Sequence, residues 1–242
     1  MPKQVFAIAF LAIMGLLVAA CGSSDPPTPT PTLEPPTGEV INLSPSKDNT
    51  IYEDAAGSFS NGAGSHIFAG NNNGGRARRA VIAFDIAGDI PAGSTIQNVT
   101  LILRMSRTRA GPETIKLHRL QADWGEGTSN ASANEGNGAV STSEDATWVH
   151  RFFNSGSWTS PGGDFSSASS ASTSVGGSGS YTWGSTAQLV ADVQGWLDDP
   201  SINFGWIVIG NEAASQTAKR FDSRENGTSA NRPVLTVTYT PP

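Results

Sequence analysis

Short runs of residues typical of β-strands recur along the chain, and this feature limits its fold more than any other. β-branched and aromatic residues concentrate in residues 79–86, 95–104, 115–120, 148–153, 205–210 and 233–239. The first two runs are separated by Pro-Ala-Gly-Ser, which is a turn signal. Long polar segments separate the others, without the alternation of strand and helix that parallel sheets require. We therefore predict an all-β fold, an antiparallel β-sandwich of jelly-roll type.

One stretch has helical spacing instead. Between residues 186 and 198 one apolar face is formed by Leu189, Val190, Val193, Trp196 and Leu197. Ser185 or Thr186 can cap the start of this helix, and Pro200 ends it. We predict one short helix near residues 186–198, placed against an end or a side of the sandwich.

Residues 154–180 are mostly Ser and Gly, with few side chains that a core could use. Such composition is typical of a long loop. We predict that this segment lies outside the core.

The N-terminal residues resemble a bacterial lipoprotein signal. Lys3 is followed by an uncharged apolar run over residues 5–20, shorter than the roughly 20 residues that span a bilayer as a helix. The run ends in Leu-Val-Ala-Ala-Cys, as a lipobox does, with Cys21 as the lipidated residue. We predict a signal peptide at 1–20 and a lipid anchor in the bacterial cell envelope. The Gly and Ser after Cys21 favour the outer membrane. An ordinary secretory signal is the alternative.

Residues 21–39 form a Pro/Thr-rich linker that favours extended polyproline II. We expect it to hold a single globular domain, residues 40–242, away from the membrane surface. A spacer for translocation is the simpler explanation.

Composition excludes several classes of protein. The net charge of −6 and the pI near 5.0 argue against nucleic acid as a partner, because neutralising phosphates needs a basic face. A single Cys excludes an intrachain disulfide. Motifs of serine hydrolases, zinc proteases and P-loop enzymes are absent from the sequence, and His66, His118 and His150 lack an evident catalytic partner. We predict that the protein is not an enzyme, with an uncharacterised polysaccharide lyase or hydrolase as the alternative.

Oxygen-bearing side chains suggest a structural calcium ion. Asp48, Asp54 and Glu212 lie in polar, Asn-rich segments, and Ca²⁺ binds six to eight oxygens at about 2.3–2.6 Å. The alternative is that these residues bond their own backbone in turns.

The tryptophans divide into two groups. Trp196 and Trp206 fall in apolar patterns and are expected in the core. Trp124, Trp158 and Trp183 lie in polar, Gly/Ser-rich surroundings, where an exposed ring could stack on a sugar. They could equally close loops onto the sandwich.

Most of the 15 basic residues are Arg, and several of them cluster. One cluster includes Arg76 and Arg78, and a second contains Arg104, Arg107 and Arg109. The planar guanidinium binds carboxylate or sulfate through two parallel hydrogen bonds, so this bias fits an acidic polysaccharide. Structural ion pairs fit it as well.

The C-terminal segment carries a family resemblance. Residues 219–225 (KRFDSRE), the Asn-Gly turn after them and residues 232–239 (RPVLTVTY) resemble the end of DNRLRE (disaggregatase-related) domains. Further segments match in order, at 79–86 with 90–93, 122–127, 145–148 and 192–197, so that the resemblance runs from about residue 46 to residue 239. It implies a jelly-roll-like sandwich, an extracellular location and noncatalytic binding of polysaccharide, alginate-like uronates included.

We therefore predict a surface-anchored lipoprotein that binds polysaccharide. In an extended segment, Arg220, Asp222 and Arg224 would share an outward face, with Phe221 turned inward. Asp222 would then orient the two guanidinium groups toward a uronate. The alternative function is a structural or adhesive protein of the envelope or matrix without glycan selectivity.

Overall fold

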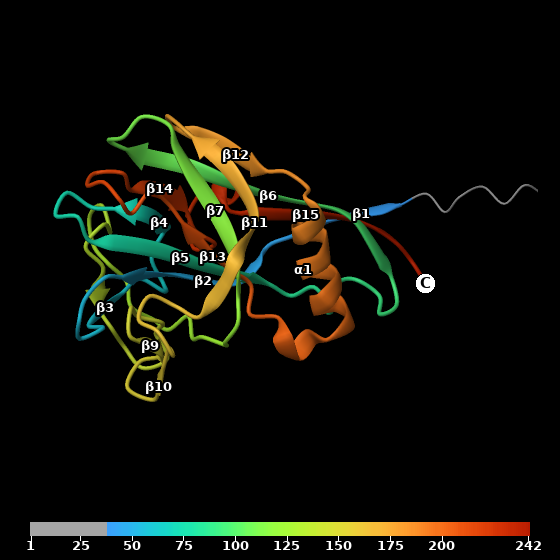
Figure 1. The fold of residues 1–242 in the computed structure, drawn as a ribbon, viewed down its shortest axis with the longest axis horizontal. Helices are drawn as coiled ribbons and strands as arrows, with labels where there is room; N and C mark the ends of the chain where they lie inside the picture. The colour runs from blue at the N-terminus through green and yellow to red at the C-terminus, as the bar shows by residue number, and fades with distance from the viewer. Residues whose placement is uncertain (1–37) are drawn as a thin grey trace, which may run out of the picture. The chain divides into compact units, whose positions relative to one another are not determined.

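The computed structural model describes residues 38–242, which fold mostly into β-structure with one short α-helix (Figure 1). One large curled antiparallel sheet contains 11 strands. They are β1 (Glu39–Leu43), β2 (Pro45–Tyr52), β4 (His66–Asn71), β5 (Ala77–Phe84), β6 (Thr95–Thr108), β7 (Glu113–Leu120), β11 (Phe165–Val175), β12 (Gly179–Trp183), β13 (Trp206–Ile209), β14 (Lys219–Asp222) and β15 (Val234–Thr240). The predicted signal peptide, Cys21 and most of the predicted linker lie outside the described residues.

The order of strands brings together segments that are distant in the sequence. The path is β1-β15-β6-β14-β4-β5-β13-β7-β11, with β12 added on β6 and β2 added on β5. Two small sheets pair β3 (Phe59–Ser60) with β8 (Ala139–Val140) and β9 (His150–Phe152) with β10 (Gly156–Ser157). Each of the predicted strand runs contains a strand, so the all-β prediction is confirmed.

The helix is also confirmed. α1 (Ala187–Asp198) begins after Thr186, whose hydroxyl accepts a hydrogen bond of 3.0 Å from the backbone N–H of Leu189. Its apolar face is buried as expected, and it packs against β6 and β11 (Figure 1). Short 3₁₀ turns follow at Pro200–Ile202 and Ser229–Asn231. None of the helices in the described part of the chain has the length and apolar character needed to cross a membrane.

The prediction of a long loop over residues 154–180 is wrong, because this segment contains β10, β11 and the start of β12. β11 pairs with β7, and its small residues let α1 approach closely. Ser170 and Ala171 are buried, and the Ser170 hydroxyl donates a hydrogen bond to Asp192 of the helix. The close contact of its small residues with α1 and the apolar side chains at its ends, Phe165 and Val175, make this strand part of the core.

Two apolar clusters hold the structure together. The larger takes side chains from strands along the whole path and from α1. In it, the rings of Trp196 and Trp206 lie 4.5 Å apart between centroids, so their predicted core position is confirmed. The smaller cluster contains Trp124 and Trp158 and packs on the opposite side of β5 and β13. Because β5 is covered on both faces, its residues 80–84 are all buried, which explains their unbroken apolar run.

Candidate functional site

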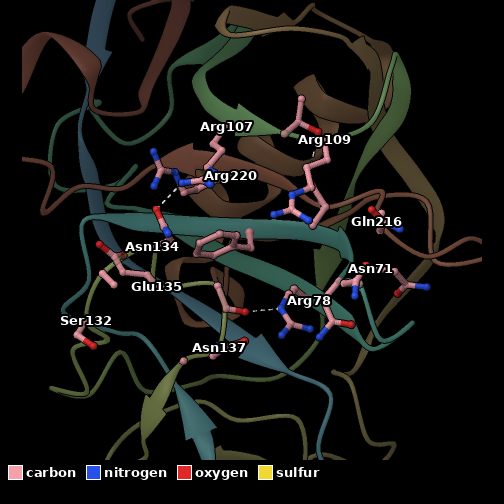
Figure 2. A pocket seen from close by; sticks show the side chains of 18 residues that line it. Asn71, Arg78, Arg107, Arg109, Ser132, Asn134, Glu135, Asn137, Gln216 and Arg220 are labelled. Carbon is pink, nitrogen blue, oxygen red and sulfur yellow. Dashed lines mark hydrogen bonds between the residues drawn. The ribbon is translucent and has the colours of Figure 1, made fainter.

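A pocket of about 480 Å³ lies between β4, the end of β6, β14 and the loop of residues 132–138 (Figure 2). Its size falls within the roughly 300–1,000 Å³ usual for ligand sites. Its charged lining is Arg78, Arg107, Arg109, Arg220 and Glu135. The rest is mainly Asn, Gln, Ser, Thr and small residues, with the ring of Phe68. A chain with a net charge of −6 thus gathers four guanidinium groups against one carboxylate.

Two of these arginines face each other across neighbouring strands. In the register of β14 and β6, Arg220 lies opposite Arg107, a placement that is unfavourable for like charges. Arg220 Nε donates to the Ser106 hydroxyl at 3.1 Å, and Arg107 donates to the side-chain oxygen of Asn134. Neither forms an ion pair with a carboxylate of residues 38–242. Burial, and then the charge of Arg107, lower the pKa of Arg220.

Arg78 is buried, with 5% of its surface exposed, and it too lacks an ion-pair partner among the residues described. Its Nε donates to the carbonyl of Gly136 at 2.8 Å and its Nη1 to that of Arg76 at 2.9 Å. Its guanidinium carbon lies 5.3 Å from the centroid of the Tyr52 ring. Burial lowers the pKa of Arg78. A buried cation whose partners are only two carbonyls and an aromatic ring favours the binding of an anion.

The single carboxylate of the pocket is fully engaged. Oε1 of Glu135 lies 2.9 Å from Nδ1 of His66, and Oε2 accepts hydrogen bonds of 2.9 Å from the Asn61 amide and from the His66 backbone N–H. Burial would raise the pKa of Glu135, but these hydrogen bonds outweigh burial and lower it. Glu135 therefore stays ionised and fastens the loop 132–138 to β4.

The backbone around the pocket is strained. Among the described residues, five other than glycine have positive φ, and three of them line the pocket: Ala133 (57°), Glu135 (60°) and Gln216 (62°). Such conformations typically cost about 1–3 kcal/mol each and cluster at functional sites. Their concentration here supports a binding role for the pocket.

The residues predicted to form one glycan-binding face do not all meet in the pocket. Arg220 and Arg78 line the pocket, whereas Arg76 is exposed outside its lining. Phe221 is buried, as predicted. Asp222 is buried as well and pairs with Arg104 at 2.9 Å, so it does not orient Arg220.

Arg224 does not belong to the pocket. β14 ends at Asp222, so Arg224 no longer follows the alternation of the strand, which corrects the predicted common face. Its guanidinium binds Glu126 through Nε at 2.7 Å and Nη2 at 3.0 Å, and its Nε lies 2.7 Å from Glu225. The side chain is committed to an acidic cluster.

Trp158 and Trp183 are buried, with 5% and 0% of their surfaces exposed. Their indole N–H groups donate to the carbonyls of Thr147 and Ile115, at 2.9 and 3.0 Å. Neither ring offers a face for stacking on a sugar, so we no longer place them at a binding surface.

The three predicted metal ligands lie in three different environments. Asp54 accepts a hydrogen bond from the backbone N–H of Ser58 at 2.9 Å, as a turn residue does. Glu212 forms a bidentate ion pair with Arg79, with both distances 2.8 Å. Asp48 is fully buried beside Glu126 and Glu225, and burial, with the charge of Glu225, raises its pKa well above the usual value.

Sequence reasoning missed Glu135 and the loop that carries it. Residues 132–138 are small and polar, and nothing in their pattern distinguishes them from an ordinary loop. Arg107 and Arg109 were recognisable only as members of a cluster.

A scan against protein-family models finds none that matches this chain. A search of the curated proteins likewise finds no match. The resemblance to DNRLRE domains therefore stays a hypothesis.

Proposed function

We propose that the pocket binds acidic, uronate-containing polysaccharide without cleaving it. The observation that carries this proposal is the opposed pair Arg107 and Arg220, which has no carboxylate partner in the described part of the chain. A uronate carboxylate between them would remove their repulsion and accept charge-assisted hydrogen bonds from both. Arg78 and Arg109 extend the same chemistry along the pocket, as neighbouring acidic sugars of one polymer require.

Binding without cleavage is supported by the titratable groups of the pocket. Among the described residues that line the pocket, Glu135 is the only titratable one apart from the arginines, and its oxygens are held by His66 and Asn61. Glycoside hydrolysis uses two carboxylates, and proton abstraction needs a free base near the substrate. The lining supplies neither.

We also propose that the curled sheet is a jelly-roll-like sandwich. In the larger apolar cluster, Ile82 of β5 and Leu117 of β7 belong with Leu103 of β6 and Leu235 of β15, which lie on the other half of the strand path. Shared packing of this kind is what two facing layers produce.

The N-terminal lipobox-like segment supports attachment to the bacterial envelope, in the outer membrane, with the lipid anchor as the contact with the membrane. The experiment is Cys21→Ser in the native host. We expect loss of diacylglycerol from the mature protein and its release from membrane fractions. A lipid-modified peptide from the variant would contradict this assignment.

The binding proposal is tested on the full chain with an array that pairs acidic glycans, such as alginate fragments, with neutral ones of similar length. We expect binding to the acidic glycans, with no new reducing ends or unsaturated products after prolonged incubation. Equal binding to neutral glycans, or none at all, would overturn the proposal. Adhesion to matrix without glycan selectivity would favour the structural or adhesive alternative.

A further inference from the structure

Three carboxylates from distant parts of the chain meet at the end of β14. Asp48 lies on β2, Glu126 in the polar segment after β7, and Glu225 three residues beyond the end of β14. One oxygen from each lies within 4.8 Å of the others. Oxygens that bind one Ca²⁺ at about 2.3–2.6 Å from the ion lie no more than about 5 Å apart, so this spacing fits one ion.

The hydrogen bonds of this acidic cluster leave two buried oxygens without a partner. Asp48 Oδ2 accepts a hydrogen bond of 2.8 Å from the backbone N–H of Arg224, but Asp48 Oδ1 has none. Glu225 Oε1 lies 2.7 Å from Arg224 Nε, but Glu225 Oε2 has no partner. Asp48 is completely buried, so water does not reach its free oxygen from the surface. Buried acceptors of this kind call for a donor or a cation.

The charges of the acidic cluster do not balance either. Arg224 is the only cation within ion-pairing distance of the three carboxylates in the described part of the chain. Lys47, the neighbour of Asp48, instead binds Asp123 and the carbonyl of Trp124. One guanidinium against three carboxylates leaves a deficit of two positive charges, which a divalent cation supplies.

We infer that the acidic cluster binds a calcium ion through Asp48, Glu126 and Glu225. An all-oxygen, carboxylate-rich set selects hard cations over zinc or copper, and Ca²⁺ accepts a less regular arrangement of oxygens than Mg²⁺, which demands a near-ideal octahedron. Glu126 Oε1 accepts hydrogen bonds from Arg224 Nε and from the backbone N–H of Asp48, whereas Oε2 accepts one from Arg224 Nη2 and keeps a lone pair for the ion. Water completes the coordination from the side of Glu126 and Glu225, which are only half-buried.

The ion joins three segments that lie far apart in the sequence. It links β2 to the segment around Glu126 and to the residues that follow β14, the strand that carries Arg220. Calcium thus stabilises the domain by binding its folded state. This inference is independent of the glycan proposal, because its test contains no glycan.

The experiment uses the full chain after dialysis against EDTA and removal of the chelator. Isothermal titration with CaCl₂ and with MgCl₂, and melting temperatures with and without each ion, are measured for the wild type, Asp48→Asn and Glu225→Gln. Glu144→Gln, an exposed position outside the acidic cluster, makes the same chemical change as Glu225→Gln and serves as the matched control.

We expect one calcium ion per chain, weaker magnesium binding, and a melting temperature raised by about 5 °C or more at 100 times Kd. Each cluster variant should bind calcium at least about tenfold more weakly, with the control unchanged. Without metal, Glu225→Gln should melt at or above the wild type because it removes a repulsive charge. With calcium, it should melt below. If Asp48→Asn does not fold, this change in the order of melting temperatures between the wild type and Glu225→Gln is the decisive result.

No calcium binding by the wild type would overturn the inference and indicate that the two free oxygens share a proton. Equal calcium affinity in the wild type and both variants would also overturn it, by placing the ion elsewhere.

Discussion

Arg220 on β14 lies directly opposite Arg107 on β6, and neither guanidinium pairs with a carboxylate of residues 38–242. Elsewhere on the same sheet the chain does supply counter-charges, since Arg104 pairs with Asp222 and Arg79 with Glu212. These two pocket arginines thus keep only neutral hydrogen-bond partners, while nearby arginines are paired with carboxylates. An arrangement that costs folding energy is expected where it serves binding.

Arg107→Ala and Arg220→Ala should each weaken binding to the best acidic glycan by about tenfold or more, because a charge-assisted hydrogen bond contributes about 1.5–3 kcal/mol. Their melting temperatures should equal or exceed that of the wild type, since each change relieves the repulsion. Calorimetry and thermal melts measure the two effects. Arg119→Ala, which removes a guanidinium outside the pocket lining, is the control. Unchanged affinity in both pocket variants would move the site elsewhere.

Arg224→Ala should lower stability and leave glycan affinity nearly unchanged. Its removal leaves the neighbouring carboxylates without their guanidinium, so the free energy of unfolding should fall by about 1–3 kcal/mol, a range reduced for the partial exposure of the side chain. Glycan affinity should stay within twofold, because Arg224 does not line the pocket. Urea denaturation in EDTA and calorimetry give the two values. A folded variant that no longer binds glycan would restore Arg224 to the binding face.

Glycan affinity should decrease several-fold as salt rises, since contacts between exposed charges are screened over about 8 Å at physiological ionic strength. Arg107 and Arg109 are exposed at the pocket, which makes this screening effective. Titrations of the same acidic glycan at a series of NaCl concentrations measure the effect, and thermal melts at each concentration check that the fold is unchanged. Affinity independent of salt would argue against guanidinium recognition.

The hydrogen bonds that Glu135 accepts should appear in the acid limb of the curve of stability against pH. The folded pKa of Glu135 is lowered from the usual 4.5, so its contribution is fully present above that pH and is lost as the pH falls through the folded pKa. The difference in unfolding free energy between the wild type and Glu135→Gln should therefore shrink below about pH 4.5. Urea denaturation from pH 7 to pH 3 tests this, with Glu144→Gln as the control. A difference that grows on acidification would contradict the assignment.

Asp192 should be essential to stability. Its buried carboxylate accepts hydrogen bonds from Ser170, from Trp206 Nε1 at 2.9 Å and from Gln188 Nε2 at 2.9 Å. Asp192→Ala leaves these donors unpaired and should cost about 2–4 kcal/mol of unfolding free energy. Asp198→Ala, at the exposed end of the same helix, should change stability little, and denaturant titration compares the two. Equal effects would mean that Asp192 contributes only helix propensity.

The elements predicted correctly are those whose local sequence favours a single type of secondary structure. The runs that became β5, β6 and β15 are rich in β-branched residues and bounded by turns. The helix has its Thr186 cap and an apolar face with the right period. For these segments local preference and burial agree, so the sequence alone is informative.

The failures share a different cause. Trp158 and Trp183 sit among Ser and Gly in the sequence, yet they are buried by strands from far along the chain. The pocket was predictable only in its residue types, since Arg78, Arg107 and Arg220 meet through the pairing of β4, β5, β6 and β14. Long-range pairing leaves no local signature.

β11 has a consequence for how this protein tolerates change. Its sequence looks uniform, but Ser170, which contacts Asp192 of α1, and Ala171 are buried, while Ser167, Ser172 and Ser174 are exposed. We therefore expect nearly identical residues to tolerate substitution differently: at the buried positions an added methyl group has to displace packed neighbours, whereas at the exposed ones most polar residues are acceptable. A saturation library over residues 165–175 should thus recover a narrow choice of residues at 170 and 171 beside broad freedom at their neighbours, a pattern of constraint that the composition conceals.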